Sequence, residues 1–332
     1  MRTPEAAISD ILRHVRPIRE TSSLPLADAA GRVLAQDAVS DVDMPPFEKS
    51  AMDGYALRCA DVGSGEAAER APLRRIGESR AGHPFNEPVP SGTCVEIYTG
   101  AEVPAGCDAV IMVEKIEREG DLVRLTEPVR EGQNICNQGE DLRVGGVVMR
   151  PGRRLTPTDL SVLAAVGCDP LTVFRRPRVT ILTTGDELVR PAERPGPGQI
   201  REGNTLHLAA LSARAGAQVT CLGLVPDEPG ELARRFGLAL ENSDVVVTTG
   251  GVSMGRYDLV AEAFRTCGVE EIFHKIAIKP GKPLWFGRRG EVLVFGLPGN
   301  PVSCLLDHEV FVRPALTRME GANDEQPALR LG

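Results

Sequence analysis

The feature that most constrains the fold of this chain is the stretch Asp244–Asp258, with the sequence DVVVTTGGVSMGRYD. Its valine run, Val245–Val247, is too short for a helix and consists of β-branched residues, so it predicts a buried strand. The pair Gly250-Gly251 follows, and glycine lets backbone N–H groups approach a ligand closely. Helical spacing resumes at Leu259–Phe264. A strand, a glycine loop and a helix in this order are typical of an anion site.

Two further apolar runs lead into polar, glycine-containing loops. Val179–Leu182 is followed by Thr183, Thr184, Gly185, Asp186 and Glu187, and Val292–Phe295 by Gly296, Leu297, Pro298, Gly299, Asn300, Pro301, Val302 and Ser303. Each loop alone could be only a turn. Because ligands of parallel α/β sheets bind outside the carboxyl ends of the strands, we expect the three loops to converge on one site.

Strands and helices alternate through the second half of the chain. The expected order is strand 179–183, helix 204–215, strand 218–224, helix 229–241, strand 244–249, helix 257–266, strand 292–296 and helix 301–312. Asn204 is expected to cap its helix and Gly216 to close it. This alternation predicts an α/β domain with a doubly wound, mostly parallel sheet.

The first half has shorter elements. Thr3-Pro4-Glu5 predicts a helix start, and Leu24–Ala38 predicts short strands about a turn at Gly31. Strands are also expected at Ala51–Leu57, Leu73–Ile76, Thr93–Tyr98, Ala109–Val113 and Leu122–Leu125. The predicted division of this α/β multidomain chain is a linking α+β region (1–45 and 142–176), a β-rich, all-β insert (46–141), an α/β domain (177–320) and a tail (321–332).

Composition excludes several classes of protein. The net charge of −8 argues against general nucleic-acid binding. No stretch approaches 18 apolar residues, so no membrane association is expected. The eight cysteines include no C-x-x-C pair and are typical of a reducing, cytoplasmic setting. At Cys304 a catalytic thiol is the alternative to a buried helical side chain. P-loop, dinucleotide and zinc-hydrolase motifs are absent from the sequence.

Charged residues cluster near the predicted loops. Lys275, Lys279 and Lys282 surround a turn stiffened by proline and glycine, which suits lysines that hold phosphate; a solvated basic face is the alternative. Acids follow strand ends at Asp186, Glu187, Asp227 and Asp258. Such carboxylates suit Mg²⁺ bound together with substrate oxygens, although Asp227 could instead cap a helix. Thr248, Thr249 and Ser253 are candidate phosphate donors.

Two segments of the β insert are unusual: Ser50–Ala56, which contains Asp53-Gly54, and Tyr98–Ala101, which contains Thr99. Asp-Gly before a strand is first a turn signal, and Asp53 could also be a ligand. From the residues alone, the chain is an enzyme or binding protein for a phosphorylated, nucleotide-like anion with Mg²⁺.

Seven ordered segments resemble the molybdopterin molybdenumtransferase family, which is related to the E domain of gephyrin. They are MPPFEKSAMDGYAL, IYTGAEVPAGCDAV, GQNICNQGEDL, TTGDEL, TTGGVSMGRYD, KIAIKPGKPLWFG and FGLPGNPVSC. The resemblance implies molybdenum cofactor biosynthesis: Mg²⁺-dependent insertion of molybdate into adenylylated molybdopterin (molybdopterin-AMP), with release of AMP. It also implies a homodimer, with other cofactor-synthesis enzymes as further partners.

The resemblance assigns roles by motif position. The implied catalytic residues are Asp53, Thr99, Glu187, Asp227, Asp258, Lys275 and Lys279. The implied metal ligands are Asp186, Glu187, Asp227 and Asp258. The implied binding residues for the adenylylated pterin are Thr184, Gly185, Asp186, Thr249, Gly250, Gly251, Ser253, Lys282, Pro298, Gly299, Asn300 and Ser303. Asp53 and Thr99 would reach the glycine loops across the dimer interface.

Two departures from the family pattern stand out. Family members usually carry a further small β domain after the helix that ends near Met319, whereas this sequence stops at Gly332. Arg256-Tyr257 precedes Asp258, where the family often has smaller or acidic residues. The alternatives to the transferase are a molybdopterin-binding or scaffold protein without turnover and a molybdopterin adenylyltransferase.

Overall fold

The computed structural model describes residues 1–63, 71–250 and 257–323, with only the backbone described for Tyr257 and Asp258. Contacts divide the chain into two compact units. The first, here called the α/β unit, comprises Met1–Asp37, Met149–Val162 and Asp169–Gly332. The second, the β-rich unit, comprises Ala38–Val148 and Leu163–Cys168. The finer division into a linking region, an insert and an α/β domain stays a prediction.

The main sheet of the α/β unit has six strands in the order β16-β13-β17-β20-β19-β18. Their bounds are β16 Gln218–Val225, β13 Arg178–Thr184, β17 Val245–Thr249, β20 Val292–Leu297, β19 Trp285–Arg289 and β18 Glu270–His274. The four strands from β16 to β20 are parallel, and β19 and β18 are antiparallel. The doubly wound, mostly parallel sheet is therefore confirmed.

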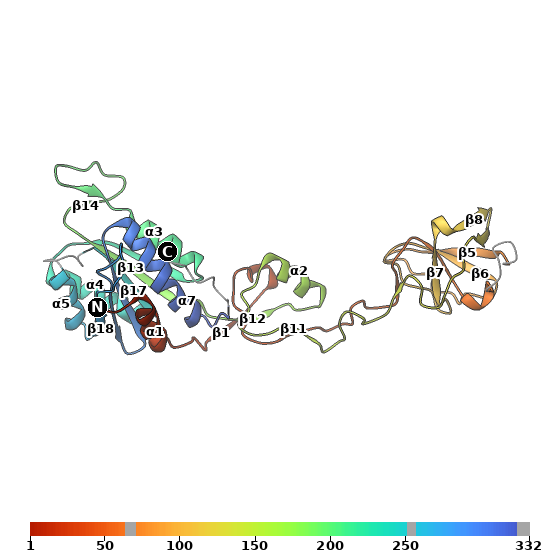
Figure 1. Cartoon of the computed structure of the whole chain (residues 1–332), viewed down its shortest axis with the longest axis horizontal. Coiled ribbons are helices and arrows are strands. Elements are labelled where there is room, and N and C mark those ends of the chain that lie inside the picture. Colours follow the sequence, from red (N-terminus) through yellow and green to blue (C-terminus); the bar gives the residue numbers. More distant parts are fainter. Residues whose placement is uncertain (64–70, 251–256, 324–332) are drawn as a thin grey trace. The chain divides into compact units, whose positions relative to one another are not determined.

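Helices cover both faces of this sheet (Figure 1). They are α1 Pro4–His14, α3 Asn204–Arg214, α4 Pro229–Asn242, α5 Tyr257–Thr266, α6 Pro301–Asp307 and α7 Arg313–Met319, with a π-helical turn at His308–Val312 between the last two. Val245 and Val247 pack in the apolar cluster with α1, α3, α6 and α7. Val246 packs in the cluster with α4 and α5. Because successive side chains of a strand point to opposite faces, the valine run is buried on both.

The structure corrects several local predictions. The antiparallel strands β18 and β19 were not predicted, and the last helix extends beyond residue 312. Asn204 does not cap α3: the N-cap is Gly203, and the first-turn N–H of Thr205 donates to Glu202 Oε1 at 2.7 Å. The Asn204 side chain is directed elsewhere, as described below. Leu24–Ala38 holds only the end of β1, a 3₁₀ turn, isolated bridges and the first residue of β2.

The β-rich unit is built on a six-stranded sheet in the order β7-β4-β6-β5-β9-β8. The bounds are β7 Ala109–Met112, β4 Gly54–Leu57, β6 Thr93–Ile97, β5 Leu73–Ser79, β9 Leu122–Leu125 and β8 Ile116–Glu119. Five of these strands match predicted segments. β8 was missed because its sequence, IERE, is largely polar and exposed. The prediction of an all-β fold for this part is confirmed.

Short elements complete the chain. They are β1 Thr21–Leu24 with β12 Leu171–Phe174, β14 Leu188–Val189 with β15 Ile200–Arg201, β3 Lys49–Ser50 with β10 Ile135–Cys136, β2 Ala38–Val39 with β11 Val147–Met149, and helix α2 Pro157–Ala165. Among the described residues, no helix has the length and apolar character needed to cross a membrane.

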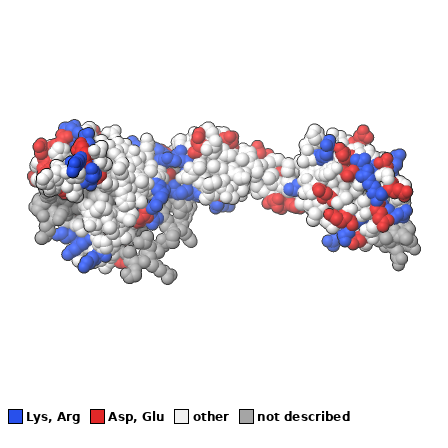
Figure 2. All heavy atoms as spheres, turned by 90° about the horizontal axis from the view of Figure 1, so that it is seen from above, with Lys and Arg blue, Asp and Glu red and all other residues white. Residues whose placement is uncertain are grey.

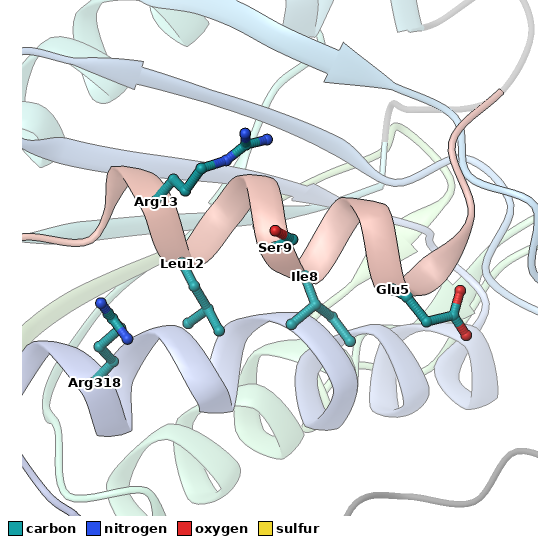
Figure 3. A pocket seen from close by; sticks show the side chains of 6 residues that line it. All are labelled: Glu5, Ile8, Ser9, Leu12, Arg13 and Arg318. Atoms are coloured by element: carbon teal, nitrogen blue, oxygen red, sulfur yellow. The ribbon is translucent and has the colours of Figure 1, made fainter.

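Two surface features lie outside the predicted site. Figure 2 shows acidic and basic side chains interspersed on the β-rich unit, where Glu96 pairs with both Arg75 and Arg118. An open groove runs between α1 and α7 (Figure 3). Its lining residues are Glu5, Ile8, Ser9, Leu12, Arg13 and Arg318. None of these belongs to the predicted site.

Candidate functional site

The carboxyl ends of the parallel strands meet at one edge of the main sheet. Thr183 of β13 pairs with Thr249 of β17, and Thr249 pairs with Leu297 of β20. On the other side, Thr184 pairs with Val225 of β16. The described parts of the three predicted loops therefore begin side by side, as the sequence predicts.

Asn204 joins two of these loops. Its side-chain Nδ2 donates to Thr249 Oγ1 at 3.1 Å and to the Gly299 carbonyl at 2.8 Å. Thr249 Oγ1 in turn donates to the Pro298 carbonyl at 2.9 Å. Both Asn204 and Thr249 are buried. The amide thus fixes the loop after β20 against the end of β17, a role that the sequence did not indicate.

Gly250 fits closely against the loop after β13. Its φ is +86°, a conformation that favours glycine. A Cβ at Gly250 would collide with the Thr184 carbonyl, and one at Gly299 would lie 3.7 Å from Gly250 Cα. The three loops are therefore packed together at Gly250, Thr184 and Gly299. Glycine is required there for close approach as well as for its φ.

The loop after β20 leads directly into α6. Asn300 is the N-cap, and its Oδ1 accepts from the N–H groups of Val302 at 3.0 Å and Ser303 at 3.2 Å. Asn300 and Gly299 are exposed, whereas Pro298 and Ser303 are buried. Asn300 Oδ1 thus accepts from two N–H groups of the first turn of α6, which ties the end of this loop to the start of the helix.

The predicted acids lie along the same edge. The Thr184 hydroxyl donates to Asp227 Oδ1, and α4 has its N-cap at Glu228 without a side-chain bond, so Asp227 is not its cap. Asp186 and Glu187 are exposed in the loop after β13. Among the described residues, no three His, Cys, Asp or Glu side chains are grouped closely enough to hold a metal ion.

The segment Lys275–Pro283, here called the lysine loop, joins β18 to β19. His274 pairs with Trp285, and Trp285 pairs with Gly296 next to the end of β20, so the lysine loop starts at the edge that carries the other loops. Lys275, Lys279 and Lys282 are all exposed. Lys275 has φ +68°, which is unusual for a residue other than glycine and indicates local backbone strain.

In the β-rich unit, Asp53 and Thr99 form a pair. Asp53 Oδ1 accepts from the Thr99 backbone N–H and from its hydroxyl, both at 2.7 Å. These bonds lower the pKa of Asp53, and both residues are exposed. The adjacent Gly54 is required, because a Cβ there would collide with the Ile111 carbonyl. The structure thus brings together two residues that are 46 positions apart.

Comparison with known proteins matches residues 2–167 to the MoeA N-terminal region (domain I and II) and residues 180–318 to a probable molybdopterin binding domain. The molybdopterin molybdenumtransferase of Haemophilus influenzae is 38% identical over 97% of this chain and 78% of that relative. The chain belongs to the molybdopterin molybdenumtransferase family. It is thus a transferase by family, within molybdenum cofactor biosynthesis.

Further relatives of the molybdopterin molybdenumtransferase family support this placement. Molybdopterin molybdenumtransferase 2 of Mycobacterium tuberculosis is 36% identical over 96% of this chain and 79% of that relative. The crystal structure of the molybdopterin biosynthesis moeA protein from Pyrococcus horikoshii OT3 has a TM-score of 0.85 at 35% identity, covering 98% of this chain and 80% of that one.

Several residues predicted for this molybdenumtransferase family site lie outside the described part. They are Gly251, Ser253 and the side chain of Asp258. Arg256 and the side chain of Tyr257, which depart from the family pattern, lie outside it as well. Cys304 is fully buried, and burial raises its pKa to about 12. Nucleophilic cysteines need a lowered pKa, so this environment is that of an unreactive core thiol. Of the two alternatives for Cys304, the structure thus favours the buried helical side chain over the catalytic thiol.

Proposed function

We propose that this chain inserts molybdate into molybdopterin-AMP and releases AMP in an Mg²⁺-dependent reaction. The observation that carries the proposal is the convergence of loops at one sheet edge, with Asn204 bonded to both Thr249 and Gly299. Exposed backbone and glycine at such an edge suit a phosphoanhydride. The lysine loop at the same edge supplies positive charge, as a substrate with several negative charges requires.

Mg²⁺ is proposed to bind among Asp186, Glu187, Asp227 and Asp258. Mg²⁺ keeps several waters and takes one or two carboxylates plus substrate phosphates, so it does not need three clustered protein ligands. Asp227, oriented by the Thr184 hydroxyl, fits such a ligand. When bound, the ion would neutralise charge that develops on the phosphate oxygens. The protein side chains then position the anhydride and the attacking oxygen.

A homodimer is proposed together with this function. Asp53 and Thr99 are exposed on the β-rich unit, where the Thr99 N–H and hydroxyl donate to Asp53. The resemblance suggests that they act on the substrate bound to the other subunit. Mixing an Asp53→Asn variant with an Asp258→Ala variant tests this arrangement: a shared site between subunits gives activity in the mixture that neither variant has alone. No gain on mixing argues for a site within one chain.

The function is tested by AMP release from molybdopterin-AMP, with molybdate and Mg²⁺ each added or withheld. We expect release that depends on both and that Asp227→Asn and Asp258→Ala each reduce strongly. The control is Asp28→Asn, an exposed acid of the 3₁₀ turn, which should retain activity. If molybdopterin-AMP binds but no AMP appears, the chain is a binding protein; if ATP is consumed with molybdopterin, it is an adenylyltransferase.

A further inference from the structure

The lysine loop presents three lysine side chains to solvent. Lys275, Lys279 and Lys282 are exposed and form no ion pair with another described residue. Backbone bonds hold the neck of the loop: Lys275 N donates to the Leu284 carbonyl at 2.9 Å and Ile276 N to the Lys282 carbonyl at 3.0 Å. The position of the tip, near Gly281, therefore decides where Lys279 and Lys282 can reach.

The tip packs against the Asp307 side chain at Gly281. Gly281 is buried and has φ +111°, and a Cβ there would collide with Asp307 Oδ1. Asp307 is the last residue of α6, the helix that begins at Asn300. One short helix thus connects the loop after β20 at its start to the lysine loop at its end.

Asp307 has an unusual environment for an acid. It is 0% exposed, and neither of its carboxyl oxygens has a hydrogen-bond partner among the described residues. Burial raises its pKa to about 8. An ionised carboxylate is costly without a partner in a dry interior. The packed arrangement therefore suits the protonated acid, and ionisation would draw water or a cation toward Gly281.

The groups around Asp307 offer it little compensating charge. On its own helix the Cys304 thiol lies near it, and burial keeps that thiol neutral. His308 follows directly; its Nε2 lies 3.0 Å from Ser212 Oγ of α3, and burial lowers its pKa to about 4, so it is neutral as well. From the loop, Lys279 and Lys282 flank Gly281 and are directed to solvent.

We propose that Asp307 is a positioning residue for the anion site: protonated, it lets the lysine loop pack through Gly281, and ionised, it displaces Gly281 and moves Lys279 and Lys282 away from the substrate. Asp307 itself touches no substrate. The inference rests on the proposed function only for the identity of the anion, because the contact between Asp307 and the loop is independent of any ligand.

The first test uses Trp285, the only tryptophan of the chain, which is buried at the start of β19 four residues after Gly281. Trp285 emission is recorded from about pH 6 to about pH 9.5. We expect a step near pH 8 in the wild type that Asp307→Asn removes. Glu309→Gln, two residues away and paired with Arg214 and Arg313, should retain the step. If the asparagine variant does not fold, Asp307→Ser replaces it.

The second test measures binding of inorganic molybdate and of AMP, separately, to the full chain at pH 7 and pH 9. We expect wild-type affinity to weaken on the order of tenfold at the higher pH, equivalent to the loss of about one lysine contact, and Asp307→Asn to remove this dependence. A step that persists in Asp307→Asn, or an affinity equal at both values, overturns the proposal. If the Trp285 step depends on Asp307 but neither anion binds at any pH, the coupling stands and the proposed function fails.

Discussion

The Asn204 side chain donates a 2.8 Å hydrogen bond to the Gly299 carbonyl, which lies 95 residues further along the chain. The same nitrogen donates to Thr249 Oγ1. A single amide therefore sets the spacing between the ends of β17 and β20. In the proposed reaction both loops contact one substrate, which requires this spacing to be kept.

We expect Asn204→Ala to lower the free energy of unfolding by about 1–3 kcal/mol, because it leaves a buried hydroxyl and a carbonyl without their donor. Asn204→Asp should cost more, because it places carboxylate oxygens against the Gly299 carbonyl. Urea unfolding, with KM for molybdopterin-AMP as a second readout, measures both. The control is Asn242→Ala, which removes an exposed amide that donates to the Leu238 carbonyl of its own helix. An equal loss in the two alanine variants would contradict the role of Asn204.

Gly250→Ala should be strongly destabilising, by about 3 kcal/mol or more, since it combines a positive φ with a collision against the Thr184 carbonyl. Gly237→Ala is the matched control. Gly237 lies within α4, and a Cβ there meets nothing within 4 Å. We expect it to stabilise the chain by about 0.5–1 kcal/mol, because alanine favours helix. Thermal unfolding of the two variants should move in opposite directions, and a shift in the same direction would refute this account.

The pair Asp53 and Thr99 predicts a pKa change. Both hydrogen bonds from Thr99 stabilise the ionised form, so the Asp53 carboxylate persists to lower pH than an ordinary aspartate. Thr99→Val removes the hydroxyl donor and should raise the pKa of Asp53, as carboxyl NMR titration would report. We expect AMP release to fall in the same variant without a change in melting temperature.

Ser91→Ala serves as the control for Thr99→Val. Ser91 donates to Asp61 at 2.6 Å in the same unit, in a similarly exposed setting. AMP release in Ser91→Ala should equal that of the wild type. Equal loss of activity in both variants would mean that the Asp53 contact has no special part in the reaction.

Asp307 predicts a pH dependence of stability with a definite sign. Because its folded-state pKa, about 8, exceeds the ordinary value, the native chain retains a proton that the unfolded chain has released. Stability should therefore fall as pH rises from about 4 to about 8 and level off above that. Asp307→Asn should be more stable than the wild type at pH 8.5 by about 2 kcal/mol or more, with a much smaller difference near pH 4. Urea unfolding at the two pH values measures this.

Glu231 supplies the opposite case. Hydrogen bonds from Arg234 and Arg235 lower its pKa to about 2. Its contribution to stability is thus present above its ordinary pKa and lost as pH falls toward 2. Glu231→Gln should therefore be less stable than the wild type at neutral and alkaline pH, and this difference should shrink as pH falls toward 2. If Asp307→Asn showed the same pattern as Glu231→Gln, the sign assigned to Asp307 would be wrong.

Much of the α/β unit was predictable, because its signals are local. The valine run of β17 and the spacing of α4 each lie within a few residues, and their predicted bounds differ from the observed ones by one residue. The parallel direction of these strands follows from their alternation with helices. The convergence of the loops at one edge then follows from the direction of the strands. The polar strand β8 was missed because its four residues carry no apolar alternation.

The sequence by itself determined the alternation of the parallel strands with helices, the glycine-containing loops at the strand ends and the motifs that indicate the family, because each depends on residues close together in the chain. Only the tertiary structure decided that Asn204 bonds to Gly299 and not to its own helix, and that Asp307 is buried against Gly281. Burial and hydrogen-bond partners depend on which distant segments pack together. A polar residue in a sequence therefore does not reveal whether water or a loop from another part of the chain will surround it.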